Sequence, residues 1–133
     1  MLANAETKWA VLKAIDSLLD CIANGRHSES VAAFTGDADC ALYGSEPDEA
    51  AIGPVALRAF FANLYAQPYR VIFALDKRTV SAVGNTAWFT GEGVYRLSTG
   101  GDAKPYRLVG VLERRNGTWL WQLFSGSEPV NSA

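Results

Sequence analysis

Apolar side chains recur every three or four positions in the first half of the chain, the spacing of helices that bury one face. Residues 5–24 follow this spacing with polar residues between. Asn24-Gly25 ends the predicted helix, because glycine adopts the left-handed conformation there without steric cost. A short second helix, capped by Ser28, is predicted over residues 28–34. A third helix begins at Gly53-Pro54, where proline fits the first turn, and stops at Gln67-Pro68.

The pattern changes to alternation of apolar and polar residues from Tyr69 onward, which is typical of strands. Gly84-Asn85 and Asn116-Gly117 are the tight-turn signals among these strands. A further strand, residues 37–43, precedes the third helix. The predicted strands of the second half cover residues 69–77, 79–83, 86–97, 105–115 and 118–125.

Helices that come ahead of a run of antiparallel strands predict an α+β fold, in which the helices lie on one face of a curved sheet. The length of 133 residues predicts one domain, residues 1–133. Such a chain buries enough surface to fold without a metal ion or a disulfide.

The last predicted strand is apolar on both faces. Trp119, Trp121 and Ser125 share one face, and Leu120 and Phe124 share the other. A sheet with one face in water would show a polar face. We therefore expect both sides to be covered, one by a pocket and the other by a second subunit, so the sequence predicts a homodimer through the outer sheet face.

The register of the last hairpin is ambiguous. A two-residue turn at Asn116-Gly117 places Leu108 opposite Ser125, whereas a three-residue turn with a bulge places Arg107 there. One residue of slip moves every side chain to the other face. We favour the bulge, because it gathers Arg107, Val109 and Val111 with Trp121 and Ser125.

Composition narrows the classes of function. The net charge of −2 and the scattered basic residues give no reason to expect nucleic acid as a partner. No apolar run is long enough for a membrane helix, and charges interrupt the N-terminal residues where a signal peptide would be apolar. Cys21 and Cys40 are expected to be buried free thiols of a reduced, cytoplasmic protein. His27 is the single histidine, so we expect no metal site and no cofactor.

The tetrapeptide Gly-Ser-Glu-Pro occurs twice, at residues 44–47 and 126–129. Different elements follow the two copies, so they do not mark a structural repeat. We interpret them as strand ends, since proline cannot continue a strand ladder. On this interpretation, any functional role falls on the flanking residues Glu49 and Ser125.

The stretches "YGSEPDEAAIGPVALRAFF" and "RLVGVLERRNGTWLWQLFSGSEP", together with the order of elements, resemble the SnoaL-like branch of the nuclear-transport-factor-2-like fold. Ketosteroid isomerase and the kinase II association domain belong to the same superfamily. The resemblance implies a cone-shaped, curved antiparallel (mixed) sheet wrapped around the three helices, with a blind cavity between them. Two departures stand out: Ala50 and Ala51 replace a frequent aromatic residue, and Ser125 occupies the position of a frequent histidine.

Two carboxylates are the candidates for proton transfer, Glu92 and Glu49. Glu92 lies between glycines in the middle of a strand, where it pairs with Arg107, serves a ligand as an orienting group or base, or faces solvent. Glu49 precedes the third helix, where it either interacts with the helix N-terminus or acts as a base. The predicted pocket residues are Tyr43, Phe60, Phe61, Tyr65, Trp88, Glu92, Arg107, Val109, Trp119, Trp121 and Ser125.

Two functions are consistent with these residues. The first is a non-catalytic binding or dimerising module whose pocket holds a small apolar or oxygenated molecule. The absence of the family histidine favours it. The second is a small isomerase or lyase in which a pocket carboxylate acts as general base and a tyrosine or arginine stabilises the oxyanion.

Overall fold

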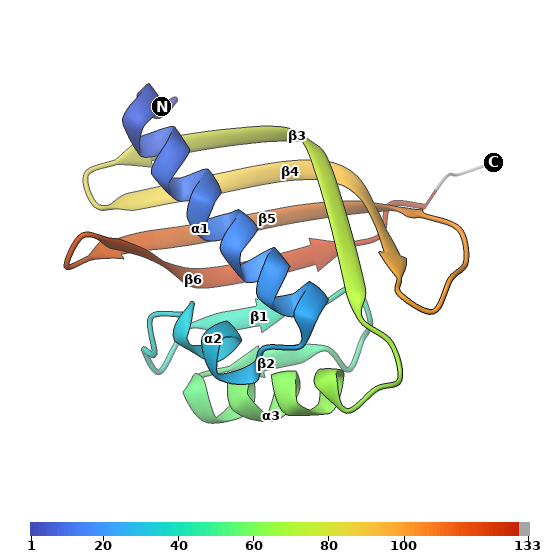
Figure 1. The fold of residues 1–133 in the computed structure, drawn as a ribbon. Helices are drawn as coiled ribbons and strands as arrows, with labels where there is room; N and C mark the ends of the chain where they lie inside the picture. Colours follow the sequence, from blue (N-terminus) through green and yellow to red (C-terminus); the bar gives the residue numbers. More distant parts are fainter. Residues whose placement is uncertain (131–133) are drawn as a thin grey trace.

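Three helices and six strands form the fold in a computed structural model that describes residues 1–130 (Figure 1). The six strands form one sheet in the order β2-β1-β6-β5-β4-β3, in which β1 and β6 are parallel and the other neighbouring pairs are antiparallel. In chain order the elements are α1 (Ala5–Asn24), α2 (His27–Ala32), β1 (Ala41–Tyr43), β2 (Ala50–Ile52), α3 (Pro54–Tyr65), β3 (Val71–Val83), β4 (Thr86–Leu97), β5 (Lys104–Arg115) and β6 (Thr118–Ser127).

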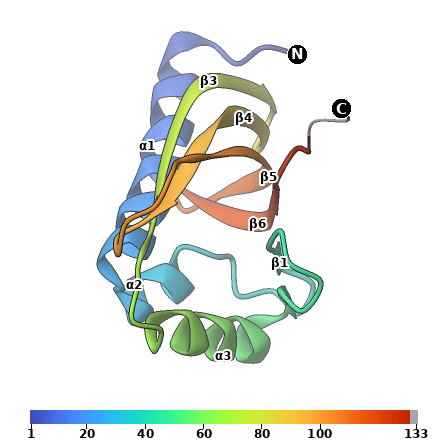
Figure 2. The ribbon, with the colours of Figure 1, turned by 90° about the vertical axis from the view of Figure 1, so that its right-hand side faces the viewer.

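The helices lie against one side of the curved sheet (Figure 2). Helix α1 crosses the inner face of the long strands, and α2 and α3 lie beyond the end of α1, beside β1 and β2 (Figures 1 and 2). Within residues 1–130, no helix lies on the opposite, outer face of the long strands (Figure 2). The fold is thus the α+β arrangement that the sequence predicts, with an unclosed sheet.

Curvature of the sheet is concentrated where β3 bends. The pairing of β3 with β4 shifts register between Leu75 and Lys77, and Gly93 pairs with Leu75 at that shift. A Cβ atom on Gly93 would collide with the backbone of Ala74 and Leu75. Glycine at this position therefore lets the two strands approach closely while β3 turns around the end of α1.

The last hairpin has a two-residue turn, so the predicted three-residue turn is wrong. Asn116 and Gly117 both have positive φ, 52° and 80°, as a type I′ turn requires. A register shift then falls inside the strands, between Val111 and Leu112, and leaves Gln122 as the extra residue of β6. Because of this bulge, neither Leu108 nor Arg107 faces Ser125; its partner is Val109.

The same bulge changes which side chains of β6 share a face. Trp119 and Trp121 point inward before it, and Phe124 and Gly126 point inward after it. Strict alternation had grouped Trp121 with Ser125, which lies on the outer face beside Val109. Arg107, Val109 and Val111 are therefore gathered with Ser125 but not with Trp121.

Other boundaries differ in smaller ways. Helix α1 has the predicted bounds, with Gly25 at φ 66° after its end, but α2 begins one residue before Ser28 and has no side-chain cap. Residues 69–77 and 79–83 join into the single strand β3. Strand β2 was not predicted, because three residues are too few to show a period.

The core lies between α1 and the inner face of β3–β6 and extends to α3. Cys21 and Cys40 are both buried and unbridged, as expected. The largest fully buried side chains are Trp121, Phe61, Phe89, Ile15, Leu18, Leu42, Leu57, Leu108, Leu112, Val11, Val80 and Cys40.

Candidate functional site

A cavity of about 260 Å³ lies between α3, the end of α1 and the inner face of the sheet. This volume is close to the lower limit of about 300 Å³ for small-molecule sites. Its walls are apolar and largely aromatic. They consist of Ile22, Leu42, Phe60, Phe61, Leu64, Tyr69, Val71, Phe73, Tyr95, Leu97, Tyr106 and Phe124.

The polar part of the lining comes from the two Gly-Ser-Glu-Pro segments and from Glu49. Parallel pairing of β1 with β6 sets Tyr43 beside Ser125, an offset of 82 positions (125 minus 43). The two tetrapeptides are separated by the same 82 positions (126 minus 44). Both copies therefore leave the sheet side by side and meet at the cavity.

Glu128, from the second tetrapeptide, is held by two hydroxyl donors. Ser45 Oγ donates to Glu128 Oε2 at 2.6 Å, and Tyr95 Oη donates to Oε1 at 2.6 Å. These two hydrogen bonds hold the pKa of the Glu128 carboxyl below its usual value. Burial, and then the hydrogen bond to Glu128, raise the pKa of Tyr95 to about 12. Glu128 therefore remains a charged acceptor with both oxygens occupied.

Glu49 is the second carboxylate of the lining and lies in a different environment. Residues 44–49 form a closed loop, in which the Gly44 N–H donates to the Glu49 carbonyl at 2.7 Å and the Glu46 N–H donates to Glu49 Oε1 at 2.9 Å. Glu49 Oε2 has no hydrogen-bond partner within residues 1–130. Burial, followed by the charges of Glu46, Asp48 and Glu128, raises the pKa of Glu49 above its usual value, against the opposing hydrogen bond from Glu46.

Tyr106 contributes a free hydroxyl to the cavity. The residue is 6% exposed, and its Oη has no hydrogen-bond partner among the described residues. A Cβ atom on Gly126 would collide with this hydroxyl, so the glycine makes the space that Tyr106 occupies. Burial, and then the charges of Glu49 and Glu128, raise the pKa of Tyr106, which keeps the phenol protonated.

A second depression, of about 760 Å³, lies near the N-terminus, beside Leu2, Glu6 and Arg114. Most of its lining side chains are exposed, with Trp119 as the buried exception. The smaller cavity instead reaches the core, where Phe61, Tyr106 and Phe124 are buried. A largely apolar enclosure with a few polar groups at one end is the usual form of a small-molecule site, so the smaller cavity is the candidate site.

The structure brings three of the predicted site residues to this cavity: Phe60, Phe61 and Glu49. Ser125 and the four predicted residues of β4 and β5 lie instead on the outer sheet face, so their assignment to the inner pocket is corrected. Glu92 and Arg107 form an ion pair there, with Arg107 Nε 2.7 Å from Glu92 Oε1. The outer-face residues are Trp88, Glu92, Arg107, Val109 and Ser125.

Three of these residues border a separate depression on the outer face, of about 270 Å³. It includes Glu92, Arg107 and Val109. Glu92 is half exposed and already paired, so its placement matches the structural alternative of a Glu92–Arg107 pair. The Glu92 carboxylate is therefore not part of the lining of the cavity on the inner sheet face.

The other four predicted residues are also absent from the cavity lining. Tyr43 is exposed beside Ser125, and Trp121 is fully buried in the core, where its Nε1 has no partner in the described part of the chain. Trp119 is buried at the far end of the sheet under Arg114. Tyr65 stacks on Phe61 but directs its hydroxyl away from the cavity, toward α2.

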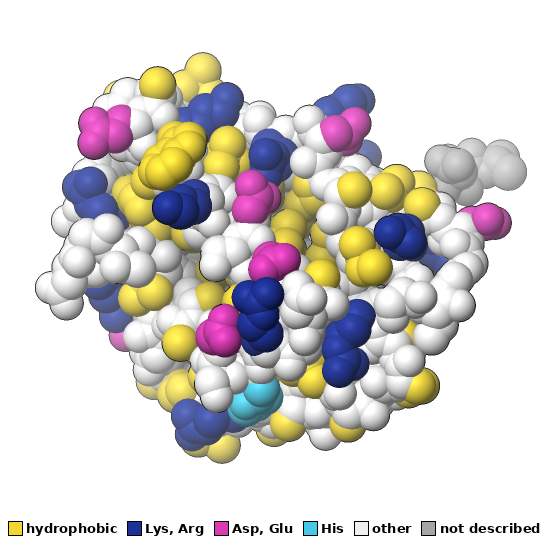
Figure 3. Space-filling view, viewed as in Figure 1, with side chains coloured by type: hydrophobic (Ala, Val, Ile, Leu, Met, Phe, Trp, Pro, Cys, Tyr) yellow, Lys and Arg dark blue, Asp and Glu magenta, His cyan; other side chains and the backbone are white. Residues whose placement is uncertain are grey.

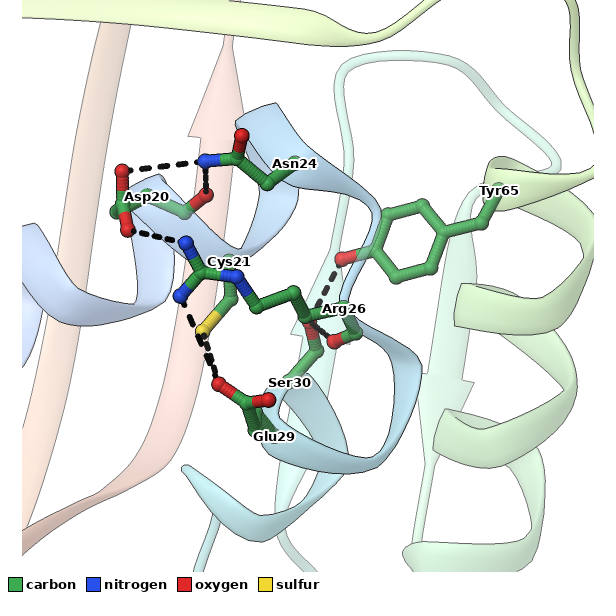
Figure 4. A network of polar contacts seen from close by, with 7 residues as sticks. All are labelled: Asp20, Cys21, Asn24, Arg26, Glu29, Ser30 and Tyr65. Atoms are coloured by element: carbon green, nitrogen blue, oxygen red, sulfur yellow. Dashed lines mark hydrogen bonds and ion pairs between the residues drawn. The ribbon is translucent and has the colours of Figure 1, made fainter.

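A polar network explains the orientation of Tyr65 (Figure 4). The hydroxyls of Tyr65 and Ser30 lie 2.7 Å apart, and Ser30 Oγ also donates to the Arg26 carbonyl at 2.6 Å. Arg26 pairs with Asp20 and Glu29, which joins the end of α1 to α2. These contacts fix the three helices against one another and leave Tyr65 no free hydroxyl for a ligand.

Sequence reasoning missed the polar residues that matter most here, Ser45, Tyr95, Tyr106 and Glu128. Alternation along β4 puts Tyr95 on the face opposite Glu92, and the face of Tyr95 is the one that points inward. The predicted pocket instead contained the face of Trp88 and Glu92. The repeated tetrapeptide was the sequence signal for Glu128. Its two copies follow two parallel neighbouring strands at the same register, which brings them together.

Several further properties bear on function. No group of three or more His, Cys, Asp or Glu side chains within residues 1–130 is arranged to hold a metal ion. None of the helices in that range is long and apolar enough to cross a membrane. On the face shown in Figure 3, acidic and basic side chains are interspersed rather than gathered into one patch.

Solved structures with the same fold have low sequence identity to this chain. An NTF2-like protein of unknown function from Pseudomonas putida KT2440 aligns with a TM-score of 0.82 and 15% identity, over 98% of this chain and 92% of that chain. A protein of unknown function with a cystatin-like fold from Nostoc punctiforme PCC 73102 aligns with a TM-score of 0.78 and 15% identity, over 97% of this chain and 96% of that chain. A ketosteroid isomerase-like protein from Erwinia carotovora atroseptica SCRI1043 aligns with a TM-score of 0.67 and 18% identity, over 97% of this chain and 100% of that chain.

A search of curated proteins found no match. The family model of the SnoaL-like domain matches residues 11–130, which is most of the chain. The protein therefore belongs to the SnoaL-like domain family, and its fold is that of the NTF2-like and cystatin-like proteins.

Proposed function

We propose that the protein binds a small, largely apolar molecule in the cavity beside α3, with the polar end of the ligand at Glu49, Glu128 and Tyr106. The observation that carries this proposal is a largely aromatic cavity with its polar groups at one end, where the Tyr106 hydroxyl has no hydrogen-bond partner among the described residues. Within residues 1–130, Trp121 Nε1 is the sole fully buried side-chain polar atom without a partner, so the Tyr106 hydroxyl is accessible from the cavity. It can therefore exchange a hydrogen bond to water for one to a ligand.

The size of the cavity restricts the ligand. A volume of about 260 Å³ suits a ligand of one or two rings with a short side chain. The aromatic side chains of Phe60, Phe61 and Phe73 favour an apolar body that packs against ring faces.

The test is isothermal titration with 3-phenylpropanol, which carries one ring and one hydroxyl. We expect measurable binding to the wild-type protein and at least a tenfold loss in Leu64→Trp, which fills the cavity from α3. Val55→Trp is the matched control, because Val55 lies on the same helix and is 72% exposed, so this variant should bind as the wild type does. Equal binding by both variants would contradict the proposal.

A second candidate function is supported by Glu49. Its free Oε2 and its raised pKa suit a general base, and the Tyr106 hydroxyl would stabilise an oxyanion formed from a ketone. The test is exchange of the protons next to the carbonyl of small cyclic ketones in deuterium oxide, followed by NMR. Catalysed exchange in the wild type that Glu49→Gln abolishes would support an isomerase or lyase, and exchange at the uncatalysed rate would exclude it.

The outer sheet face supports a homodimer. Trp88 is 38% exposed and Val109 is 46% exposed there, beside the half-buried Val111 and Leu123. Apolar residues at the centre of a strand face are unfavourable in water, and a second copy of the same face would cover them. Sedimentation equilibrium of the wild type and Val109→Asp tests this: a dimer that becomes a monomer is expected, and a wild-type monomer would contradict it.

A further inference from the structure

Acidic side chains are the sole charged groups in the cavity lining. The lining includes Glu46, Glu49 and Glu128, and within the described residues it includes no Lys, Arg or His. Asp48 lies close enough to Glu49 to raise its pKa further. Lys104 is the cation whose charge reaches Glu128, and it lies outside the lining. The cavity therefore has a negative end.

Aromatic rings form much of the remaining wall. Seven aromatic side chains line the cavity: Phe60, Phe61, Tyr69, Phe73, Tyr95, Tyr106 and Phe124. The faces of aromatic rings attract cations, and the attraction increases when the cation is removed from water. Carboxylates and aromatic rings around one enclosure thus favour the same sign of ligand charge.

Two polar atoms of the lining have no hydrogen-bond partner among the described residues and can reach a ligand in the cavity. Glu49 Oε2 can accept a hydrogen bond, and so can the Tyr106 hydroxyl, whose own proton is free to rotate. A protonated amine donates up to three hydrogen bonds and accepts none. A carboxylate or phosphate would instead bring a negative charge against three carboxylates, and the described lining contains no cation to offset them.

We infer that the ligand of this cavity is a primary amine in its protonated form, with an aromatic or otherwise apolar body, and that the site rejects carboxylates and phosphates. The ammonium group lies between Glu49 and Tyr106, close to the charge of Glu128, and the apolar body packs against the phenylalanine rings. This inference rests on the proposed binding function and specifies the chemical class of its ligand.

The experiment compares three probes with one skeleton and different head groups: 3-phenylpropylamine, 3-phenylpropanol and 3-phenylpropanoate. We expect the amine to bind about tenfold more tightly than the alcohol, since hydrogen bonds between ionised groups are about twice as strong as neutral ones. No binding of the propanoate is expected. Tighter binding of the alcohol or the propanoate than of the amine would overturn the inference and leave the proposed binding function standing, whereas no binding of any probe would overturn both.

Glu49→Gln separates charge from shape. We expect it to weaken binding of the amine about tenfold and to change binding of the alcohol less than threefold, because the amide keeps the size but not the charge of the carboxylate. Glu92→Gln on the outer face is the matched control and should change neither value. Equal losses for the amine and the alcohol in Glu49→Gln would contradict an ammonium site.

Discussion

Ser45 and Glu128 lie 83 positions apart in the sequence, and the Ser45 hydroxyl donates to Glu128 Oε2 at 2.6 Å. Each belongs to one copy of the same tetrapeptide, and the parallel pairing of β1 with β6 brings the two copies together. The contact joins two strand ends and also fixes one carboxylate of the cavity. Fold and candidate site therefore depend on the same hydrogen bond.

Loss of either donor to Glu128 should reduce stability. Ser45→Ala and Tyr95→Phe each remove one hydrogen bond to a charged acceptor, and we expect each to lower the free energy of unfolding by about 1.5–3 kcal/mol. Urea denaturation measures the change. Ser127→Ala is the control, because Ser127 is exposed at the neighbouring strand end. Losses no larger than that of the control would show that the two bonds do not hold Glu128.

Glu49 and Glu128 should respond to pH in opposite directions. The raised pKa of Glu49 means that its contribution to stability is complete below the usual carboxyl pKa of 4.5 and is lost as the pH rises through its folded-state pKa. At pH 7, Glu49→Gln should therefore raise the free energy of unfolding. The increase should exceed the change of about 0.5 kcal/mol that is typical of surface substitutions. This gain should disappear toward pH 4.

Glu128 has a lowered pKa, so its contribution is present above 4.5 and is lost as the pH falls through its folded-state pKa. We expect Glu128→Gln to cost about 1–2 kcal/mol at pH 7 and progressively less in acid, because the charged acceptor is then lost in the wild type as well. Thermal unfolding from pH 3 to 8 measures both variants. The same pH trend in the two variants would contradict the difference between the two environments.

Gly126 is expected to be intolerant of a side chain although its backbone is not left-handed. A Cβ atom there collides with Tyr106, so Gly126→Ala should lower the free energy of unfolding by about 1–3 kcal/mol through overpacking. Tyr106→Leu removes the colliding atoms, and the double variant should recover part of the loss. Additive losses in this double-mutant cycle would show that the two residues are not coupled.

The Glu92–Arg107 pair should matter little. Both side chains are about half exposed, so Glu92→Gln is expected to cost less than about 1 kcal/mol in urea denaturation. Exposed ion pairs gain little because water screens both charges. A cost above about 2 kcal/mol would show that the outer face is buried, for example in a dimer.

Apart from the short β2 and the division of β3, the order of elements could be predicted from the sequence, because helical and alternating patterns are local properties. The bounds of α1 and the inner and outer sets of β4 follow from side-chain period and from Gly25. The period does not show which of the two sets faces inward, because the set with Trp88 and Glu92 alternates as regularly as the set with Phe89 and Gly91. The wrong choice of face moved Trp88, Glu92 and Val109 into the predicted pocket.

The site depended on two features that a local pattern does not contain. One is the bulge at Gln122, which exchanges the faces of β6 and separates Trp121 from Ser125. The other is the parallel neighbour of β6, β1, which lies about eighty residues earlier in the chain. Phe60, Phe61 and Glu49 line the cavity because they belong to α3 and its preceding loop, which the Gly53-Pro54 signal locates.

The account is tested most directly by amide NMR of the isotopically labelled protein during titration with 3-phenylpropanol. We predict that the shifted signals cluster at the polar end of the cavity, at Gly44, Ser45 and Gly126, and at the neighbouring residues of α3 and β5. Shifts confined to the outer face around Trp88 and Val109, or to the N-terminal depression beside Leu2, would contradict the cavity as the binding site.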